Sequence, residues 1–268
     1  MNKLALQLIF NKKKSSLFFI CIIALSIALM LSAIPVFGAV IDASNEILGN
    51  RYGTHNVILF NISSVQYSKI IEEEIVKAHG IIYNFGSWEI DGTDNFLTVG
   101  HLDYDALSIG KQKLLQGRMP QAANEIVLEQ NAMYRFSEEV NLKDSIHFTY
   151  NGKEYTFQVV GILSGYTNNW YTGENQLKRG YNDLPNALVD YEIYSDLAFE
   201  THALVEYIER NAYYDYQKNP EIRWAENYLY TMNGYEEQIR PLEMFRTVFF
   251  LIILVAVFLV FCVMIPLY

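Results

Sequence analysis

The chain has 268 residues and a formal net charge of −10, and all 30 of its acidic residues lie at or after Asp42. An acidic segment of this kind repels nucleic acid and anionic lipid headgroups, so neither is expected as its partner. The two cysteines, Cys21 and Cys262, both lie in long apolar runs. The polar segment between those runs therefore has no disulfide and must be stabilised by its own core, which about two hundred residues can supply.

Two apolar runs, Leu17–Val40 and Thr247–Leu267, bracket the polar segment. At about 1.5 Å per residue, each is long enough as a helix to cross the roughly 30 Å hydrocarbon layer of a membrane. A cleaved signal peptide is the alternative for the first run, but this run exceeds the roughly 7–15 apolar residues of such a peptide. The pattern predicts two transmembrane helices, residues 17–40 and 247–267.

Basic residues predict the orientation of the first helix. Lys12, Lys13 and Lys14 directly precede the first apolar run. Since the positively charged end of a transmembrane helix stays in the cytoplasm, we expect residues 1–16 there and residues 41–246 outside the membrane. The sequence thus predicts a multi-pass protein of the cell membrane with an extracellular central domain.

The first part of the outer segment has the pattern of a split βαβ unit. Asn56–Phe60 is rich in β-formers and bounded by polar residues, which predicts a strand. Ser63, or the serine after it, can cap a helix that the apolar spacing carries to about His79. Ile81–Phe85 predicts the second strand. Residues 41–53, ahead of this unit, are either a short connector or a helical stalk.

The middle of the outer segment predicts a small antiparallel β unit. Asn151-Gly152 is a strong two-residue hairpin signal, and the alternating runs Ser145–Tyr150 and Glu154–Leu163 flank it. We expect this β unit to be inserted into the α+β unit. The spacing elsewhere predicts a strand over 125–128, a short helix over 130–135, a long loop over 165–185, a strand over 187–189 and a helix over 196–214. Residues 221–230 fit a helix or a strand equally.

Catalytic and metal-binding patterns are missing from the sequence. The five histidines are scattered without metal-ligand spacing, and there is no Gly-x-Ser-x-Gly elbow, phosphate-binding loop or zinc-protease helix. His101, Asp103 and Asp105 are the only local cluster of hard ligands, and a solvated turn is the favoured interpretation. The sequence predicts that the chain is not an enzyme and carries no metal or cofactor.

Trp170 and Tyr171 are the candidate aromatic contact on the outer surface. Their neighbours are Asn and Gly rather than apolar residues. Aromatic side chains with a polar tip can line peptide or glycan sites. Burial of these rings in the core is the alternative.

The most specific stretch is Leu114–Leu128, which reads Leu-Leu-Gln-Gly-Arg-Met-Pro-Gln-Ala-Ala-Asn-Glu-Ile-Val-Leu. Gly117 permits an unusual backbone angle, and Pro120 stiffens the turn. Arg118 can donate to several backbone carbonyls at once, and Asn124 ends the loop ahead of the strand. On these residues alone the stretch is a well-made turn.

The order of this motif resembles the extracellular domain of MacB/FtsX-type ABC transporter permeases. A leucine, Gly-Arg-x-Pro and then Asn-Glu-Ile-Val-Leu are followed by a hairpin ending in Val-Val-Gly-Ile. The resemblance implies a porter-like α+β extracellular domain over residues 41–246, with a βαβ unit and an inserted small antiparallel β subdomain over about 114–165. Two transmembrane helices flank this domain. The residues it assigns to the family's turn and strand are Gly117, Arg118, Pro120, Asn124, Glu125 and Gly161. Lys143-Asp144 departs from the family's usual Gly-Asp.

The resemblance also implies a function. The chain would be a permease subunit whose outer domain transmits ATP-driven motion, so that a peptide, lipid-linked or drug-like substrate is exported or removed. ATP would be bound by a separate ABC ATPase subunit. The other expected partners are a second permease copy or the remaining permease half, and membrane lipid. Because family members continue past the second helix, the chain is expected to be a truncated permease or the front part of a split one.

A two-helix, membrane-anchored extracellular sensor or ligand-binding protein without transport is the alternative function. Few residues follow the second apolar run, which leaves little chain to receive a signal in the cytoplasm. Co-purification with an ATPase would separate the two hypotheses.

Overall fold

The computed structural model describes residues 13–170, 184–194, 196–208 and 222–264. The chain divides into two compact units: a helix unit of residues 1–47 and 235–268, and a sheet unit of residues 48–234. The helix unit contains the two apolar runs, and the sheet unit contains most of the polar segment between them.

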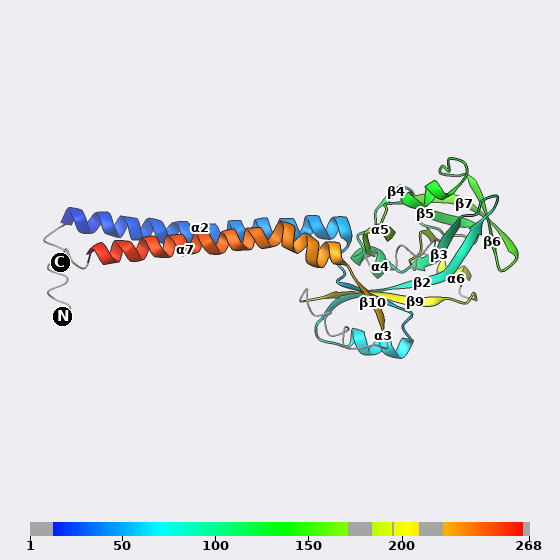
Figure 1. Ribbon diagram of the computed structural model, residues 1–268, viewed down its shortest axis with the longest axis horizontal. Helices are drawn as coiled ribbons and strands as arrows, with labels where there is room; N and C mark the ends of the chain where they lie inside the picture. The colour runs from blue at the N-terminus through cyan, green and yellow to red at the C-terminus, as the bar shows by residue number, and fades with distance from the viewer. Residues whose placement is uncertain (1–12, 171–183, 195, 209–221, 265–268) are drawn as a thin grey trace. The chain divides into compact units, whose positions relative to one another are not determined.

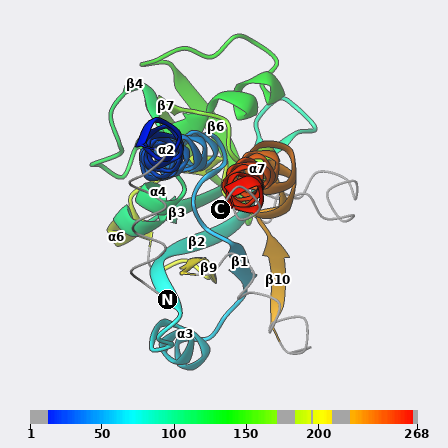
Figure 2. The same cartoon turned by 90° about the vertical axis from the view of Figure 1, so that its left-hand side faces the viewer.

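Two long helices account for most of the described part of the helix unit (Figures 1 and 2). Helix α2 is Lys13–Tyr52, its last five residues belonging to the sheet unit, and helix α7 is Arg240–Met264. Both are long and apolar enough to cross a membrane, and their apolar stretches are 0% buried. Phe37 of α2 contacts Phe245 and Phe249 of α7, with ring centroids 5.9 and 5.6 Å apart. Such an uncovered apolar surface fits a membrane protein.

The sheet unit is built on a mixed sheet, of which four strands form the predicted split βαβ unit. These are β1 Val57–Phe60, β2 Val76–Ile90, β9 Glu200–Tyr207 and β10 Arg223–Glu226. Their order is β10-β1-β9-β2 with antiparallel neighbours, so β1 and β2 are parallel with β9 between them. Helix α3, Ser64–Ile71, connects β1 to β2, and its predicted cap Ser63 accepts from the N–H of Gln66.

The chain between β2 and β9 closes into a six-stranded ring, here called the barrel. Its strands are β2 together with β3 Phe96–Leu102, β5 Glu125–Glu129, β6 Ser145–Tyr150, β7 Lys153–Leu163 and β8 Ala187–Leu188. Pairing runs β2-β3-β8-β5-β7-β6 and returns from β6 to β2. Buried side chains that include Trp88, Phe148 and Phe157 fill a single cluster in this part. Strand β4, Leu114–Gly117, pairs with β7.

Two further cores lie on opposite faces of β1 and β9. Ile58 and Leu204 pack with side chains from α4, Tyr104–Ile109, and α5, Thr167–Trp170. Val57 and Val205 belong to a separate cluster that includes Ile70 of α3. Because successive strand residues point to opposite faces, both strands are buried on each side. Shorter elements are η1 Gln130–Arg135, α6 Tyr191–Tyr194, η4 Leu229–Asn233 and η5 Tyr235–Ile239, the last two being π-helical.

Two predicted helices are wrong in part or in whole. Helix α3 ends at Ile71 rather than near His79, because the chain from Val76 onward pairs with β9. Within the helix predicted over 196–214, residues 200–207 are instead the strand β9, and residues 209–214 lie outside the described residues. Since β9 is buried on both faces, it lacks the alternation that marks a half-exposed strand.

Other predictions are confirmed or sharpened. The Asn151-Gly152 hairpin joins β6 and β7, and the strands and short helix predicted over 125–135 are β5 and η1. Residues 41–52 are a helical stalk continuous with α2. The ambiguous segment 221–230 contains β10 and the start of a π-helix. The insertion between β2 and β9 is longer than the predicted 114–165, since β3 and β8 also belong to its barrel.

Candidate functional site

Gly117 and Gly161 allow the motif turn to pass directly over strand β7. Gly117 has φ +74°, and a β-carbon on it would lie 2.8 Å from Leu142 Cδ1 and 2.9 Å from Gly161 Cα. A β-carbon on Gly161 would overlap the backbone carbonyl of Arg118. The N–H of Arg118 donates to Val160 O at 2.9 Å, which fixes this crossing. Both glycines are therefore required by close backbone approach.

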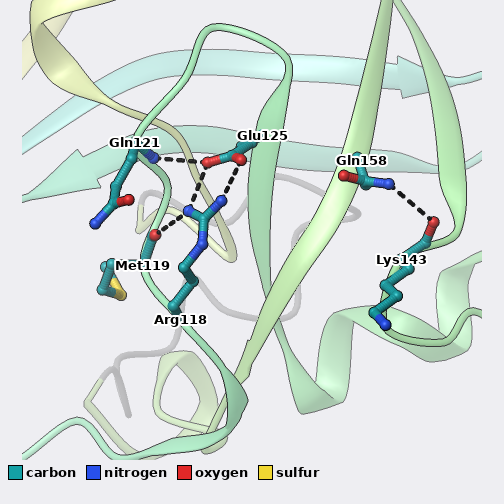
Figure 3. A network of polar contacts seen from close by, with 6 residues as sticks. All are labelled: Arg118, Met119, Gln121, Glu125, Lys143 and Gln158. Atoms are coloured by element: carbon teal, nitrogen blue, oxygen red, sulfur yellow. Dashed lines mark hydrogen bonds and ion pairs between the residues drawn. The ribbon is translucent and has the colours of Figure 1, made fainter.

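Arg118 and Glu125 form a bidentate ion pair that closes the turn (Figure 3). Arg118 Nη1 donates to Glu125 Oε2 at 2.7 Å, and Nη2 donates to Oε1. Nη1 also donates to Met119 O at 3.0 Å, and Gln121 N donates to Glu125 Oε2 at 2.8 Å. Hydrogen bonds from Arg118 and then from the Gln121 backbone lower the pKa of Glu125 to about 2. The carboxylate therefore stays charged at neutral pH.

The ion pair was not foreseen from the sequence, which predicted that Arg118 binds several backbone carbonyls. The Arg118 guanidinium donates to one carbonyl, that of Met119, and to the carboxylate seven residues later. Asn124 is exposed, and its carbonyl accepts from Gln158 N at 2.7 Å, so it joins the loop to β7. Pro120 is partly buried within the turn. Together these residues hold β4, β5 and β7 in register.

Trp170 is buried, so the predicted outer-surface contact is wrong for this residue. Its side chain is 1% exposed, and its ring packs against His55 and Tyr166 with centroids 4.8 and 4.7 Å apart. A β-carbon on Gly110 would overlap the ring. His55 and Gly110 come from distant parts of the chain, so the local Asn and Gly composition does not reveal these contacts. Tyr171 lies outside the described residues.

Buried Glu129 holds the segment that carries Trp170. Its Oε1 accepts from Thr167 N at 2.9 Å and its Oε2 accepts from Thr167 Oγ1 at 2.6 Å. Burial raises the pKa of this carboxyl group, and the hydrogen bonds from Thr167 and the Tyr166 backbone oppose that rise. Strand β5 is thereby joined through α5 to Trp170 and His55.

The remaining predicted site residues are the N-terminal lysines and the cluster of hard ligands around Asp103. Lys13 and Lys14 begin α2, and Lys12 lies outside the described residues, so their role in orientation stays a prediction. Asp103 caps α4, accepting from Ala106 N at 2.6 Å, rather than lying in a free turn. Among the described residues, no group of three or more His, Cys, Asp or Glu side chains could hold a metal ion.

The chain enters and leaves the sheet unit at one place, here called the joint, which comprises residues 48–56 and 226–234. Leu48 is 1% exposed, and a β-carbon on Gly234 would lie 2.8 Å from Leu48 Cδ2. Asn227 is fully buried, and its Nδ2 donates to Tyr52 O at 2.9 Å and to His55 O at 3.1 Å. The end of α2 is thus bonded directly to the chain that follows β10.

Further hydrogen bonds tie the joint to the sheet. Thr54 N donates to Ile109 O at 2.8 Å, and Thr54 Oγ1 donates to Glu206 Oε2 at 2.6 Å. Lys77 of β2 forms an ion pair with the same carboxylate. Gly53 closes the helix end with φ +82° and donates its N–H to Gly49 O at 2.8 Å. No local sequence pattern indicates this network, because its members are far apart in the chain.

His55 is a neutral, buried member of the joint. Desolvation lowers its pKa to about 3. Its Nδ1 lies 3.5 Å from Asn227 Nδ2. Among the described residues, His55 Nε2 and Asn227 Oδ1 have no hydrogen-bond partner. The joint therefore combines the hydrogen bonds from Asn227 Nδ2 to Tyr52 O and His55 O with these two unsatisfied buried atoms.

No family model matches the sequence, and no curated protein matches it. Among solved structures, the chain is similar to the extracellular domain of the noncanonic ABC-type transporter YknZ from Gram-positive bacteria, with 9% identity and a TM-score of 0.38 over 60% of this chain and 88% of that one. It is also similar to the periplasmic region of MacB from Actinobacillus actinomycetemcomitans, with 12% identity and a TM-score of 0.39 over 66% and 90%. At these identities and TM-scores the likeness does not assign the chain to a family.

Proposed function

We propose that this chain is a membrane-spanning component of an ABC transporter permease. In this proposal the two apolar helices cross the membrane, and the sheet unit lies outside and is moved through them. A separate ATPase subunit binds and hydrolyses ATP. The observation that carries the proposal is the joint, in which Asn227 bonds the end of α2 to the chain leading into the second helix.

The joint delivers both chain connections to neighbouring strands of one sheet. Strand β1 begins five residues after Tyr52, and β10 ends directly before Asn227. The two strands pair from Val57↔Glu226 to Phe60↔Arg223. A displacement of either connection therefore acts on the same edge of the split βαβ unit, because hydrogen-bonded strands move together.

Strand β2 extends this mechanical connection to the barrel. Its first part pairs with β9, and its second part pairs with β3 and β6. A single 15-residue strand thus belongs to both the βαβ unit and the barrel. The Gly117–Glu125 turn then holds β4, β5 and β7 in register, which suits an outer domain that moves as a body.

The motif of residues 114–128 supports the permease proposal from the sequence side, because its order resembles that of MacB/FtsX-type permeases. The N-terminal lysines support a cytoplasmic N-terminus and an extracellular sheet unit. We extend the proposal to assembly with an ATPase subunit and a second permease copy or half. The substrate class is a peptide, a lipid-linked molecule or a drug-like molecule.

Co-purification tests the proposal directly. The full chain, tagged and expressed in its native host, is extracted in mild detergent, and an ABC ATPase subunit is expected to co-purify in stoichiometric amount. Reconstitution of that complex in nanodiscs should change the ATPase rate relative to the ATPase alone. Deletion of residues 240–264 removes α7 and serves as the control that should abolish association. A chain that purifies without any ATPase would favour the two-helix sensor instead.

A further inference from the structure

A pocket lies beside the end of strand β2, where that strand pairs with β6 (Figure 1). Three segments line it: the end of β2, the chain after η1 and the start of β6. Its volume is about 480 Å³, within the range of roughly 300–1,000 Å³ that ligand sites occupy. None of the residues that line it belongs to the joint or to the motif turn, so the proposed function does not account for it.

The floor of the pocket is apolar and belongs to the barrel core. Ile90, Val140 and Ile146 line it, are between 2% and 6% exposed, and are members of the barrel cluster. Phe136 also lines it and packs against that cluster, its ring centroid 6.2 Å from that of Phe148. An apolar side chain of a ligand would therefore leave water by packing onto this floor.

The rim of the pocket is acidic. Four exposed carboxylates line it, those of Asp91, Glu138, Glu139 and Asp144. Among the described residues, no lysine or arginine lines the pocket. Arg135, which directly precedes the second wall, donates from Nη1 to Phe96 O at 2.6 Å instead. An acidic rim without a basic side chain of its own favours a positively charged ligand.

The carboxylates are spread along the rim rather than gathered at one point. In the described part of the chain, no group of three or more His, Cys, Asp or Glu side chains could hold a metal ion. Asp91 Oδ1 accepts from Thr149 Oγ1 at 2.9 Å, and Asp144 Oδ2 accepts from Asn141 N at 2.7 Å, which fixes these two side chains. Charges spread in this way fit an extended ligand with several positive groups better than a single ion.

Backbone and side-chain hydrogen bonds hold the walls of the pocket in place. Asn95 Nδ2 donates to Arg135 O at 2.7 Å, which ties the start of the second wall to the turn between β2 and β3. Lys143 N donates to Val159 O at 2.7 Å, and Val159 N donates to Asp144 O at 2.9 Å, which ties the third wall to β7. A site that is formed in advance loses little conformational entropy when it binds a ligand.

We propose that this pocket binds a basic, partly apolar peptide segment, whose lysine or arginine side chains meet the rim while an apolar side chain packs onto the floor. The charge of the chain disfavours other occupants: a second copy, with its net charge of −10, and an anionic lipid would both be repelled. The inference goes beyond the proposed function, because it names a binding site and its ligand and requires neither transport nor an ATPase.

Binding of a labelled peptide to the full chain tests the proposal. The chain is placed in nanodiscs of zwitterionic lipid, so that the lipid does not attract the probe, and empty nanodiscs give the blank. The probe is a short fluorescent peptide of alternating lysine and leucine, and its anisotropy measures binding. We expect saturable binding with a Kd on the order of 10 μM, which weakens as salt is added. Peptides with serine for leucine, or with glutamate for lysine, should each bind roughly tenfold more weakly or worse.

A double substitution locates the binding on the rim. Glu138→Gln combined with Glu139→Gln removes two of the four rim charges, and in the described part of the chain neither side chain makes a hydrogen bond or ion pair that would be lost. We expect the chain to fold normally and the lysine–leucine peptide to bind roughly tenfold more weakly. Glu72→Gln combined with Glu74→Gln is the matched control, because it removes the same charge from exposed glutamates between α3 and β2. This control should leave binding unchanged.

Three results would overturn the proposal. Equal weakening in the two double variants would mean that the acidic surface as a whole attracts the probe. Equal binding of the leucine and serine peptides would mean that the apolar floor is not used, and no saturable binding up to about 1 mM would mean that the pocket takes no such peptide. The peptide series uses the unaltered chain, so it decides alone if a variant does not fold. None of these results bears on co-purification with an ATPase, so failure of this proposal and failure of the permease proposal are separable.

Discussion

The motif turn and the joint both hold separate segments of the chain together, but they do so with different chemistry. The turn uses two glycines and the charged pair Arg118–Glu125, whose carboxylate accepts from Arg118 and from Gln121 N. At its centre the joint has the neutral side chains of His55 and Asn227, and no described residue bonds His55 Nε2 or Asn227 Oδ1. A fully bonded ion pair resists rearrangement, whereas an incompletely bonded neutral site can rearrange. The difference indicates that the turn fixes the barrel, and it supports our proposal that movement enters the sheet unit at the joint.

The largest expected effect on stability comes from removing the side chain of Trp170, whose ring packs against His55 of the joint. Trp170→Ala removes a fully buried ring and should lower the free energy of unfolding by about 4 kcal/mol. Denaturant unfolding of the full chain in detergent, followed by circular dichroism, measures it. Tyr134→Ala is the control, because Tyr134 is 86% exposed and its loss should change stability by at most about 0.5 kcal/mol. Similar losses for both would contradict the buried packing of Trp170.

A β-carbon at Gly117 should have the next largest effect, because it breaks the crossing of the motif turn over β7. Gly117→Ala combines a strained φ of +74° with overlap of neighbouring backbone, and we expect a loss of about 3 kcal/mol. Gly152→Ala has the same φ of +74° but no atom within 4 Å of the added carbon, so about 1 kcal/mol is expected. The difference between the two variants isolates the close approach. Equal losses would show that the crossing is not tight.

The motif turn and the joint also differ in how much of each can be predicted from the sequence. The turn could be located in advance, since its glycine, arginine and glutamate lie within one short motif, although their pairing was missed. The joint could not, because His55 and Asn227 are 172 residues apart and neither carries a local pattern. Trp170 fails for the same reason: its partners Gly110 and His55 are distant in sequence, so its local Asn-rich context is misleading.

The fold shows a parallel division between local and non-local signals. The Asn151-Gly152 hairpin, the Ser63 cap and the apolar helices follow from short-range chemistry and are confirmed. Strand β9 was predicted as a helix, because an apolar run buried on both faces has neither period clearly. The closure of the barrel through β6 and β2 depends on pairing across more than fifty residues, which no window of sequence contains.

The pH dependence of stability should distinguish the joint from the motif turn, and we expect the larger change in stability with pH at the joint. The pKa of His55 is lowered from 6.5 to about 3, so the unfolded chain binds a proton there that the folded chain does not. Folding is therefore opposed as the pH falls from about 6.5 towards 3. His55→Phe removes this term, so its stability relative to the wild type should rise as the pH falls from 7 to 4. Denaturant midpoints at several pH values measure it, and a constant difference would contradict the burial of His55.

Glu125→Gln should have the smallest effect on stability, and this effect should depend on pH over a lower pH range than that of His55→Phe. Its folded pKa of about 2 lies below the value of about 4.3 for an unfolded glutamate, so the unfolded chain binds the proton first as the pH falls. The stabilisation from Arg118 is fully present above about pH 5 and is lost as the pH falls towards 2. Glu125→Gln keeps the acceptor for Gln121 N but not the charge. The wild type should thus exceed this variant by a constant margin from pH 7 to 5, and the margin should shrink below pH 4. Because the His55 difference changes between pH 6 and 5 while the Glu125 difference does not, one pH series distinguishes the joint from the motif turn.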